Sequence, residues 1–306
     1  MRWAQLQRSV EGTLARPGSA SYDEVRLLQN PRYDDQLPLA VLSVASAADV
    51  ATGIAFAQDH DLPLAIRSGG HSYPGWSAGG SPRALVLDCR PLSDVTLDGD
   101  VTTIGPGALL ADVYDTLGSS GRAIAGGSCG TVAIGGLTLG GGVGVLTRAM
   151  GLTCDAVTAM QVVTADGQVR RASADEEPDL FWALRGAGGG HLGIVTSFTF
   201  ATDAAPTIST VYLEWVADAA ADVVRAWQGW APTADERLWS TLKLLGGADH
   251  PDGPTVLLSG TWTGPSGGLD DQLATFLRDV PTPTVRTDHV RDYREQMAAY
   301  AGSGER

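Results

Sequence analysis

Apolar residues recur along this chain with two periods, one typical of helices and one typical of strands. Val50, Ile54 and Ala57 stand at helical spacing, and they follow Ser46 and Asp49, which carry the signature of a capping box. This pattern predicts an amphipathic helix that begins just after the serine.

Short apolar or β-branched runs bounded by turn residues predict the strands of the first two thirds of the chain. The expected strands cover residues 62–66, 84–88, 95–97, 101–104, 158–164, 168–172 and 194–200, and the expected helices cover 47–60, 107–117 and 179–184. Turn sequences at 98–100 and 165–167 join two pairs of strands as hairpins. Because hairpins are mixed with a β-α-β order, the pattern indicates an α+β fold rather than a regularly alternating sheet.

Glycine becomes sparser after about residue 204, and the pattern of elements changes there. The later part is expected to hold strands at 210–215, 238–245 and 255–262 and helices at 219–230 and 268–278. A chain of 306 residues exceeds the size at which one hydrophobic core usually keeps growing. We therefore predict two domains, residues 1–204 and residues 205–306.

The charge balance limits the partners that the chain can have. Asp and Glu number 35 against 21 Lys and Arg, a formal net charge of −14. So acidic a surface disfavours nucleic acid and anionic membranes as partners. No apolar run reaches the roughly 18 residues of a spanning helix, and the first thirty residues contain no signal-peptide core. A cytoplasmic location is therefore expected unless an export signal was trimmed, whereas the oligomeric state is left open.

The histidines and cysteines do not indicate a metal site or a disulfide framework. The five histidines lack metal-ligand spacing, so no bound metal is expected. Cys89 and Cys154 lie in apolar, strand-like settings and are expected to be buried free thiols. Cys129 differs because it lies in a glycine-rich segment where a packing role is hard to assign.

Nine of the nineteen residues from 126 to 144 are glycine, too many for a stable helix or a central strand. Apolar residues at Val132, Ile134, Leu137 and Leu139 interrupt this segment. They favour a packed loop that cradles a ligand over a flexible linker.

Two generic motifs occur in the glycine-rich segments but lack their structural context. Residues 188–193 spell the dinucleotide pattern G-x-G-x-x-G, yet the expected helix precedes them and the expected strand follows, the reverse of a Rossmann turn. Residues 126–130 spell the G-x-S-x-G nucleophile elbow, but residues 131–136 make a poor helix start. Neither a Rossmann dehydrogenase nor a serine hydrolase is favoured.

Two short loops combine a nucleophilic side chain with glycines. The segment 67–73 (Arg-Ser-Gly-Gly-His-Ser-Tyr) follows an expected strand, and its consecutive amides could hold a pyrophosphate as a backbone nest. His71 in this segment and Cys129 in the second glycine-rich segment both have glycine neighbours, which allow a close approach to a ligand.

In their order and context these two loops resemble the flavin-attachment loops of the berberine bridge enzyme-like oxidases, within the vanillyl-alcohol oxidase class of FAD proteins. The matching segments are residues 22–23, 38–44, 67–73, 129–132, 135–136, 140–142, 179–186 and 193–196. The resemblance implies a PCMH-type FAD-binding domain of two subdomains, followed by an α/β substrate domain with an antiparallel sheet.

The resemblance also implies how FAD is held. His71 corresponds to the residue joined to the flavin 8-methyl carbon, and Cys129 to the residue joined to C6, so bicovalent FAD is expected. Such attachment needs a neutral imidazole and a thiolate as nucleophiles. The other expected FAD contacts are Arg67, Ser68, Gly69, Gly70, Ser72, Gly130, Thr131, Gly135, Gly136, Gly193 and Val195.

Two more matches bear on reactivity. Val132 falls where oxygen-reactive relatives tend to carry valine, which favours an oxidase, although a plain core valine is the alternative. Tyr73 matches a tyrosine that contacts substrate near the flavin in carbohydrate-oxidising relatives, and it is the one candidate catalytic side chain; otherwise it is an amphipathic wall residue.

The implied function is an FAD-linked oxidoreductase that removes a hydride from an alcohol-like carbon of a saccharide or natural product to flavin N5, with oxygen as acceptor. Relatives continue into a C-terminal segment with a Tyr-x-Asn-type motif that carries the presumed base, and no such motif occurs before Arg306. We therefore expect a C-terminally short chain with an incomplete substrate domain. A catalytically silent flavin-binding fragment and a noncovalent FAD dehydrogenase remain as alternatives.

Overall fold

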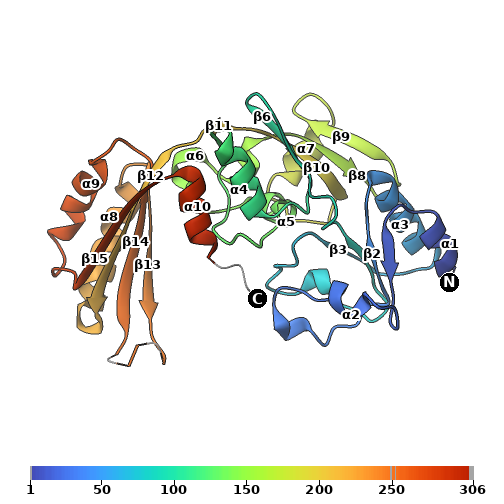
Figure 1. The fold of residues 1–306 in the computed structure, drawn as a ribbon, viewed down its shortest axis with the longest axis horizontal. Helices are drawn as coiled ribbons and strands as arrows, with labels where there is room; N and C mark the ends of the chain where they lie inside the picture. Colours follow the sequence, from blue (N-terminus) through green and yellow to red (C-terminus); the bar gives the residue numbers. More distant parts are fainter. Residues whose placement is uncertain (1, 249, 252, 303–306) are drawn as a thin grey trace.

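The computed structural model describes residues 2–248, 250–251 and 253–302. Figure 1 shows a broad body that contains the first two sheets and, beside it, a separate unit built on the last four strands. The antiparallel sheets, the two subdomains of the first body and the mixture of helix and sheet confirm the predicted α+β fold class.

The first subdomain is a four-stranded sheet covered by a long helix. Its strand order is β1-β2-β4-β3, with β2, β4 and β3 parallel and β1 antiparallel. The strands are β1 (Thr13–Ala15), β2 (Ala40–Ser43), β3 (Leu64–Arg67) and β4 (Leu85–Asp88), and the helices are α1 (Trp3–Arg8), α2 (Tyr22–Val25) and α3 (Ala47–Asp59). The Ser46 side chain accepts the Asp49 amide, and Val50, Ile54 and Ala57 are buried, which confirms the predicted helix and its cap.

The second subdomain is a five-stranded antiparallel sheet with the order β5-β6-β10-β8-β9. The strands are β5 (Val95–Asp98), β6 (Val101–Ile104), β8 (Val157–Val163), β9 (Val169–Ser173) and β10 (Ile194–Ala201). The helices are α4 (Leu110–Ser119), α5 (Ile134–Leu139), α6 (Thr147–Met150) and α7 (Pro178–Leu184). Both predicted hairpins form, β5 with β6 and β8 with β9. One apolar core joins α4 and α5 to this sheet.

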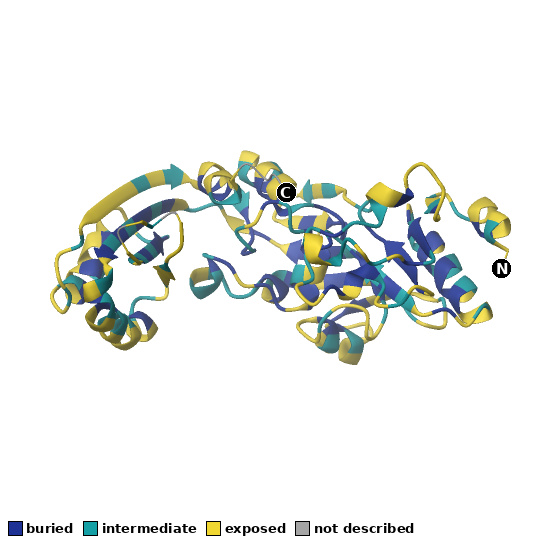
Figure 2. Cartoon of the chain, turned by 90° about the horizontal axis from the view of Figure 1, so that it is seen from below, coloured by how far each residue is buried: buried dark blue, intermediate teal, exposed yellow. Residues whose placement is uncertain are grey.

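The last sheet has the order β13-β14-β12-β15 and is antiparallel throughout. Its elements are β12 (Thr207–Val216), α8 (Ala220–Trp230), β13 (Leu238–Leu245), β14 (Thr255–Trp262), α9 (Gly268–Leu277) and β15 (Val285–Asp292). One face packs against α8 and α9 through Leu213, Trp215, Leu258 and other apolar side chains. Figure 2 shows β15 at the edge of this unit, where most of its residues are exposed.

Helix α10 (Tyr293–Ala301) connects this unit back to the first body. It follows β15 directly and packs against α4, so Tyr293 and Met297 belong to the same core as the second sheet. A short pair of strands, β7 (Arg122–Ala123) and β11 (Asp203–Ala204), lies between the two parts. The division at residue 204 stays a prediction.

Two local expectations were wrong, and two elements were not anticipated. The glycine-rich segment does contain a helix, α5, because buried contacts rather than intrinsic propensity hold its backbone. Cys154 is buried as expected, but it lies in a 3-10 turn (Thr153–Ala156) and not in a strand. Strand β15 and helix α10 were not anticipated, since β15 is an exposed edge strand with charged residues at half of its positions.

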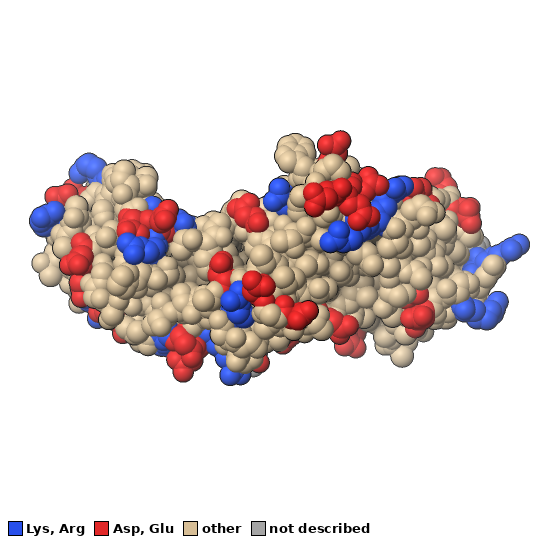
Figure 3. Space-filling model, turned by 90° about the horizontal axis from the view of Figure 1, so that it is seen from above, with Lys and Arg blue, Asp and Glu red and all other residues tan. Residues whose placement is uncertain are grey.

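Charged side chains are spread over the face drawn in Figure 3, where basic groups stand in small clusters beside acidic ones. Arg170, for example, forms ion pairs with Asp166 and Glu177 at 2.7 Å and 3.0 Å. Within the described residues, no helix combines the length and apolar character that crossing a membrane requires.

Candidate functional site

The first predicted loop leaves the end of strand β3 and turns sharply at Gly70. This glycine has φ +76°, a left-handed conformation that favours glycine, and its carbonyl accepts the Gln29 amide at 3.2 Å. The turn brings His71 into a half-buried position. The Nε2 atom of His71 is buried and has no hydrogen-bond partner, so one polar atom of this loop is available to a ligand.

The second predicted loop is held against the start of α4 by main-chain hydrogen bonds. The Leu110 amide donates to the Val132 carbonyl at 2.9 Å, and the Ala111 amide donates to the Gly130 carbonyl at 3.1 Å. Cys129 lies at the turn of this loop, and its carbonyl accepts the Val132 amide at 3.2 Å. The loop is therefore a fixed structure rather than a flexible linker.

The three cysteines occupy different environments, as the sequence predicted for two of them. Cys89 and Cys154 are buried, and burial raises the pKa of the Cys89 thiol to about 12. Cys129 is exposed. It is the accessible thiol of the chain.

The two loops meet, although about sixty residues separate them. A Cβ added to Gly69 would lie 2.6 Å from the Ala133 amide nitrogen and 3.2 Å from the Thr131 carbonyl oxygen, so only glycine permits this approach. Burial lowers the pKa of the His71 imidazole, and a hydrogen bond with the Thr131 main chain opposes that effect. The neutral imidazole is thus favoured at neutral pH.

The start of α5 contributes to the same place. Its first turn lies beside the first loop, because a Cβ added to Gly135 would lie 2.6 Å from the Ser68 hydroxyl oxygen. The next residue, Gly136, is exposed and has no atom within 4 Å of an added Cβ. This glycine borders open space, whereas its neighbour is tightly enclosed.

A third glycine-rich segment, residues 186–193, closes against the other two. The Gly188 amide donates to the Leu139 carbonyl at 2.7 Å, and a Cβ on Gly190 would lie 2.9 Å from Ile66 Cδ1. Gly193 has φ +150° and leads into β10, where Val195 is buried. The sequence predicted FAD contacts at Gly193 and Val195, but it did not predict that residues 186–190 close against the other two segments.

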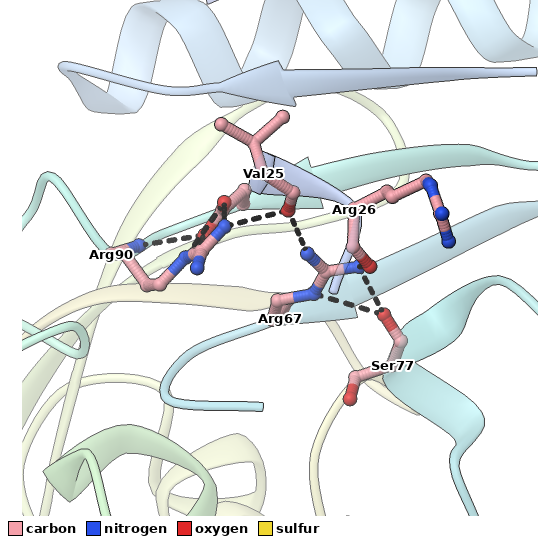
Figure 4. Close-up of polar contacts among 6 residues, drawn as sticks. Val25, Arg26, Arg67, Ser77 and Arg90 are labelled. Atoms are coloured by element: carbon pink, nitrogen blue, oxygen red, sulfur yellow. Dashed lines mark hydrogen bonds and ion pairs between the residues drawn. The ribbon is translucent and has the colours of Figure 1, made fainter. Parts of the chain in front are cut away.

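Arg67 is placed differently from the other predicted residues. Its guanidinium is buried and donates to the carbonyls of Ser77 (3.1 Å and 3.0 Å), Val25 and Arg26, as Figure 4 shows. Burial lowers its pKa to about 10, and the Asp88 carboxylate opposes that effect, so the group stays charged at neutral pH. These hydrogen bonds occupy the Arg67 side chain, so only the main chain of this residue is available to bind a cofactor.

Two predicted residues at the first loop lie near its surface. Tyr73 is 91% exposed, and its carbonyl accepts the Tyr33 hydroxyl at 2.8 Å. Ser72 is half-buried, and its carbonyl accepts the Gly75 amide at 3.1 Å. The catalytic role of Tyr73 stays a prediction, because its ring has no enclosing pocket among the described residues.

The donor set suits a flavin nucleotide better than a metal ion. Within residues 2–248, 250–251 and 253–302, no three His, Cys, Asp or Glu side chains lie together as metal ligands. A buried imidazole nitrogen without a partner, an exposed thiol and three converging glycine segments instead offer two nucleophiles and many main-chain amides. These residues fit a covalently bound FAD.

Comparison with known proteins decides the family. Residues 38–173 match the FAD binding domain family, and these residues include both nucleophile-bearing loops. Residues 38–173 therefore form a domain of the FAD binding domain family, and the relatives and solved structures that the chain resembles are FAD-linked oxidoreductases, among them a berberine bridge enzyme-like protein. The family assignment agrees with the resemblance that the sequence indicated.

Relatives and solved structures of this family extend well beyond the chain. Xylooligosaccharide oxidase from Thermothelomyces thermophilus is 34% identical over 287 residues, which are 89% of this chain and 56% of the relative. Physcomitrella patens BBE-like 1 superposes with a TM-score of 0.90 and 28% identity, over 98% of this chain and 64% of that one. The chain spans about half the length of the curated relatives that it matches.

A third similar protein, known from a solved structure, shows how FAD can be attached to the protein chain. The glucooligosaccharide oxidase of Acremonium strictum superposes with a TM-score of 0.85 and 29% identity, over 99% of this chain and 63% of that one. Its FAD is described as 6-S-cysteinyl and 8α-N1-histidyl.

Proposed function

We propose that this FAD-linked oxidoreductase holds its cofactor by two covalent bonds, one from the His71 imidazole and one from the Cys129 sulfur. The observation that carries the proposal is the meeting of a buried, unpartnered imidazole nitrogen with the loop of the exposed thiol. The bicovalent FAD of a structural neighbour supports it.

The residues supply what each bond requires. Burial lowers the pKa of His71 and so favours the neutral, nucleophilic imidazole, and the exposed position of Cys129 leaves its sulfur accessible to the flavin. His71 would lose its ring N–H hydrogen and bond to the 8-methyl carbon, which loses one hydrogen. Cys129 would lose its thiol hydrogen and bond to C6, which loses one hydrogen. Each electron pair passes to oxygen and yields one hydrogen peroxide.

We further infer that the chain takes part in the oxidation of an alcohol-like carbon of a saccharide or a natural product. When bound, FAD supplies the hydride acceptor at N5 and hands the electron pair to oxygen. Val132 lies half-buried in the second loop, three residues after Cys129, and we assign to its small side chain the role of leaving access for oxygen. The names of two oligosaccharide oxidases among the relatives support a saccharide substrate.

The last sheet offers a polar surface to such a substrate. Successive side chains along each strand point to opposite faces of the sheet. The face opposite α8 and α9 therefore carries Tyr212, Ser259, Thr261 and His289. The Thr261 hydroxyl lies 2.6 Å from the hydroxyl of Tyr300 in α10. Burial raises the pKa of Tyr300 to about 12, so this hydroxyl stays protonated at neutral pH and acts as a hydrogen-bonding group rather than as a base.

Covalent attachment is tested on denatured protein. Acid-precipitated wild-type chain should stay yellow, and its intact mass should exceed the chain mass by one FAD. Cys129→Ala should retain a histidyl link only, and the His71→Ala, Cys129→Ala double variant should release all flavin. Cys89→Ala removes a buried thiol and serves as the matched control, with both links intact. A colourless wild-type precipitate of unmodified mass would contradict the proposal.

Activity is tested separately by peroxide release. Purified chain with covalent flavin is incubated with a panel of oligosaccharides in air, and peroxide is measured against the double variant. Peroxide release supports an oxidase. Substrate oxidation that requires an artificial electron acceptor in place of oxygen would instead indicate a dehydrogenase. Absence of substrate oxidation with either acceptor would indicate a flavin-binding chain without turnover.

A further inference from the structure

Tyr114 is a buried tyrosine whose hydroxyl serves the second flavin loop. It lies on the inner face of α4 with Leu110, Val113 and Leu117, all of which are buried. Its hydroxyl donates to the Gly127 carbonyl at 2.6 Å. A buried phenol needs such a partner, and this one is a main-chain carbonyl two residues before Cys129.

A second tyrosine holds the same segment from the other side. Tyr293, in α10, is buried and donates from its hydroxyl to the Ile124 carbonyl at 3.0 Å. Its ring meets the Tyr114 ring edge-on, with the ring centroids 5.7 Å apart. Between the two bonds, a Cβ added to Gly126 would lie 2.5 Å from the Tyr114 hydroxyl oxygen. The chain from residue 124 to residue 127 is therefore fixed against two phenols.

Contacts at Gly130 fix the other side of the thiol. A Cβ added to Gly130 would lie 2.8 Å from Ala301 Cβ and 3.2 Å from Ala111 Cβ, so α10 and α4 enclose this residue. Burial raises the pKa of Tyr114 well above its ordinary value, with smaller contributions from Tyr293 and from Cys129. The Tyr114 bond to the Gly127 carbonyl and the contacts at Gly130 thus anchor the Cys129 loop on both sides of the thiol.

We propose that Tyr114 is the positioning residue for Cys129, and that its hydrogen bond to the Gly127 carbonyl presents the thiol for attachment to flavin C6. This inference rests on the proposed bicovalent attachment. In the positioned step, a carbon–sulfur bond replaces the S–H bond of Cys129 and the C6–H bond of the flavin. The electron pair and the two hydrogens leave to oxygen as hydrogen peroxide.

The expected effect of losing this bond follows from its burial. A buried hydrogen bond contributes up to about 1.4 kcal/mol, which corresponds to a tenfold change. A nucleophile that leaves its attack geometry loses further rate, because positioning supplies much of the advantage of an intramolecular reaction. The His71 link should be retained, since its loop is also held away from the Cys129 loop, where the Gln29 amide donates to the Gly70 carbonyl at 3.2 Å.

The test compares Tyr114→Phe with Tyr22→Phe. Tyr22 is the matched control, because it too is buried and donates to a main-chain carbonyl, that of Pro38 at 2.5 Å, away from the Cys129 loop. After denaturation and digestion, mass spectrometry gives the fraction of chains with flavin on His71 and on Cys129. Tyr114→Phe should keep the histidyl link and lower the cysteinyl fraction about tenfold. Tyr22→Phe should match the wild type.

Hydrogen–deuterium exchange on the same purified proteins gives a readout that does not require attachment. The peptide that spans residues 124–132 should exchange about tenfold faster in Tyr114→Phe than in wild type and Tyr22→Phe. Unchanged exchange, or a full cysteinyl fraction in Tyr114→Phe, would overturn the positioning role. Wild type without any covalent flavin would contradict the proposed function instead, and the exchange comparison would still decide whether Tyr114 anchors the loop.

Discussion

The His71 imidazole reaches the main chain of Thr131, which joins two loops that lie sixty residues apart in the sequence. The contact is possible because Gly69 lies against Ala133 without a side chain between the two backbones. One loop therefore carries an imidazole to the other, which carries the thiol. Substitutions at this contact between the two loops, and at the residues that support it, should therefore change how much flavin is bound.

Gly69→Ala should separate the two loops. Its added methyl would lie 2.6 Å from the Ala133 nitrogen, a main-chain atom that cannot move aside cheaply. We expect a loss of about 1 to 3 kcal/mol in the free energy of unfolding and much less covalent flavin. Gly229→Ala, in α8, meets no atom within 4 Å and is the control for a glycine replacement. Urea unfolding and flavin-to-protein ratios measure both, and equal behaviour of the two variants would contradict the close approach.

Gly136→Ala should have the opposite effect on stability. This glycine is in α5 and borders open space, so alanine should stabilise the helix by about 0.5 to 1 kcal/mol. The same methyl would occupy space assigned to FAD, so flavin content should fall. Thermal unfolding and absorbance of the purified variant separate the two effects. A full complement of flavin would show that FAD does not lie against this turn.

The histidyl link should form at lower pH than an unperturbed imidazole would allow. Burial lowers the His71 pKa, so the nucleophilic neutral form persists below the ordinary value of about 6.5. Flavin incorporation into flavin-free Cys129→Ala protein, followed against pH, should be half-maximal below that value. Half-maximal incorporation above pH 7 would be inconsistent with a depressed pKa.

The lowered pKa of His71 also makes the free energy of unfolding depend on pH. Between the folded pKa and about 6.5, the unfolded chain binds more protons at this histidine than the folded chain does. The free energy of unfolding should therefore fall as pH falls through that window, and it should fall less in His71→Gln. Urea midpoints of the two proteins at a series of pH values give the comparison.

Arg67→Leu should destabilise the first subdomain. The change leaves the carbonyls of Arg26 and Ser77 without their donor and leaves the Val25 carbonyl with Arg90 alone, and we expect a loss of about 3 to 5 kcal/mol. Arg83→Leu removes one exposed bond to the Asp61 carbonyl and should alter stability by less than about 0.5 kcal/mol. Urea unfolding of both variants tests this, and similar midpoints would show that the Arg67 contacts contribute little.

Val132→Leu should slow the reaction with oxygen more than the reaction with substrate. The residue is half-buried beside the core of the second subdomain. Under the proposed route for oxygen, a longer side chain here would fill that access. Stopped-flow absorbance of the flavin measures reduction and reoxidation separately. Equal slowing of both half-reactions would rule out selective access at this position.

Local pattern was sufficient for much of the fold. The cap at Ser46 and the spacing of Val50, Ile54 and Ala57 gave helix α3, and both Asp-Gly turns gave hairpins, because these features depend on neighbours in sequence. Burial of Cys89 also followed from its apolar run. The glycine-bounded His71 and Cys129 identified the family and the cofactor before any contact was known.

Contacts between distant segments decided the rest. Helix α5 forms in a glycine-rich segment because Gly135 is enclosed by Ser68 and Pro106, which local propensity cannot foresee. The buried hydroxyl of Tyr114 in α4 needs a hydrogen-bond partner, and only the tertiary structure shows that the partner is the Gly127 carbonyl. Hydrophobic periodicity tells which side of an element is buried, whereas the identity of what it meets depends on tertiary packing.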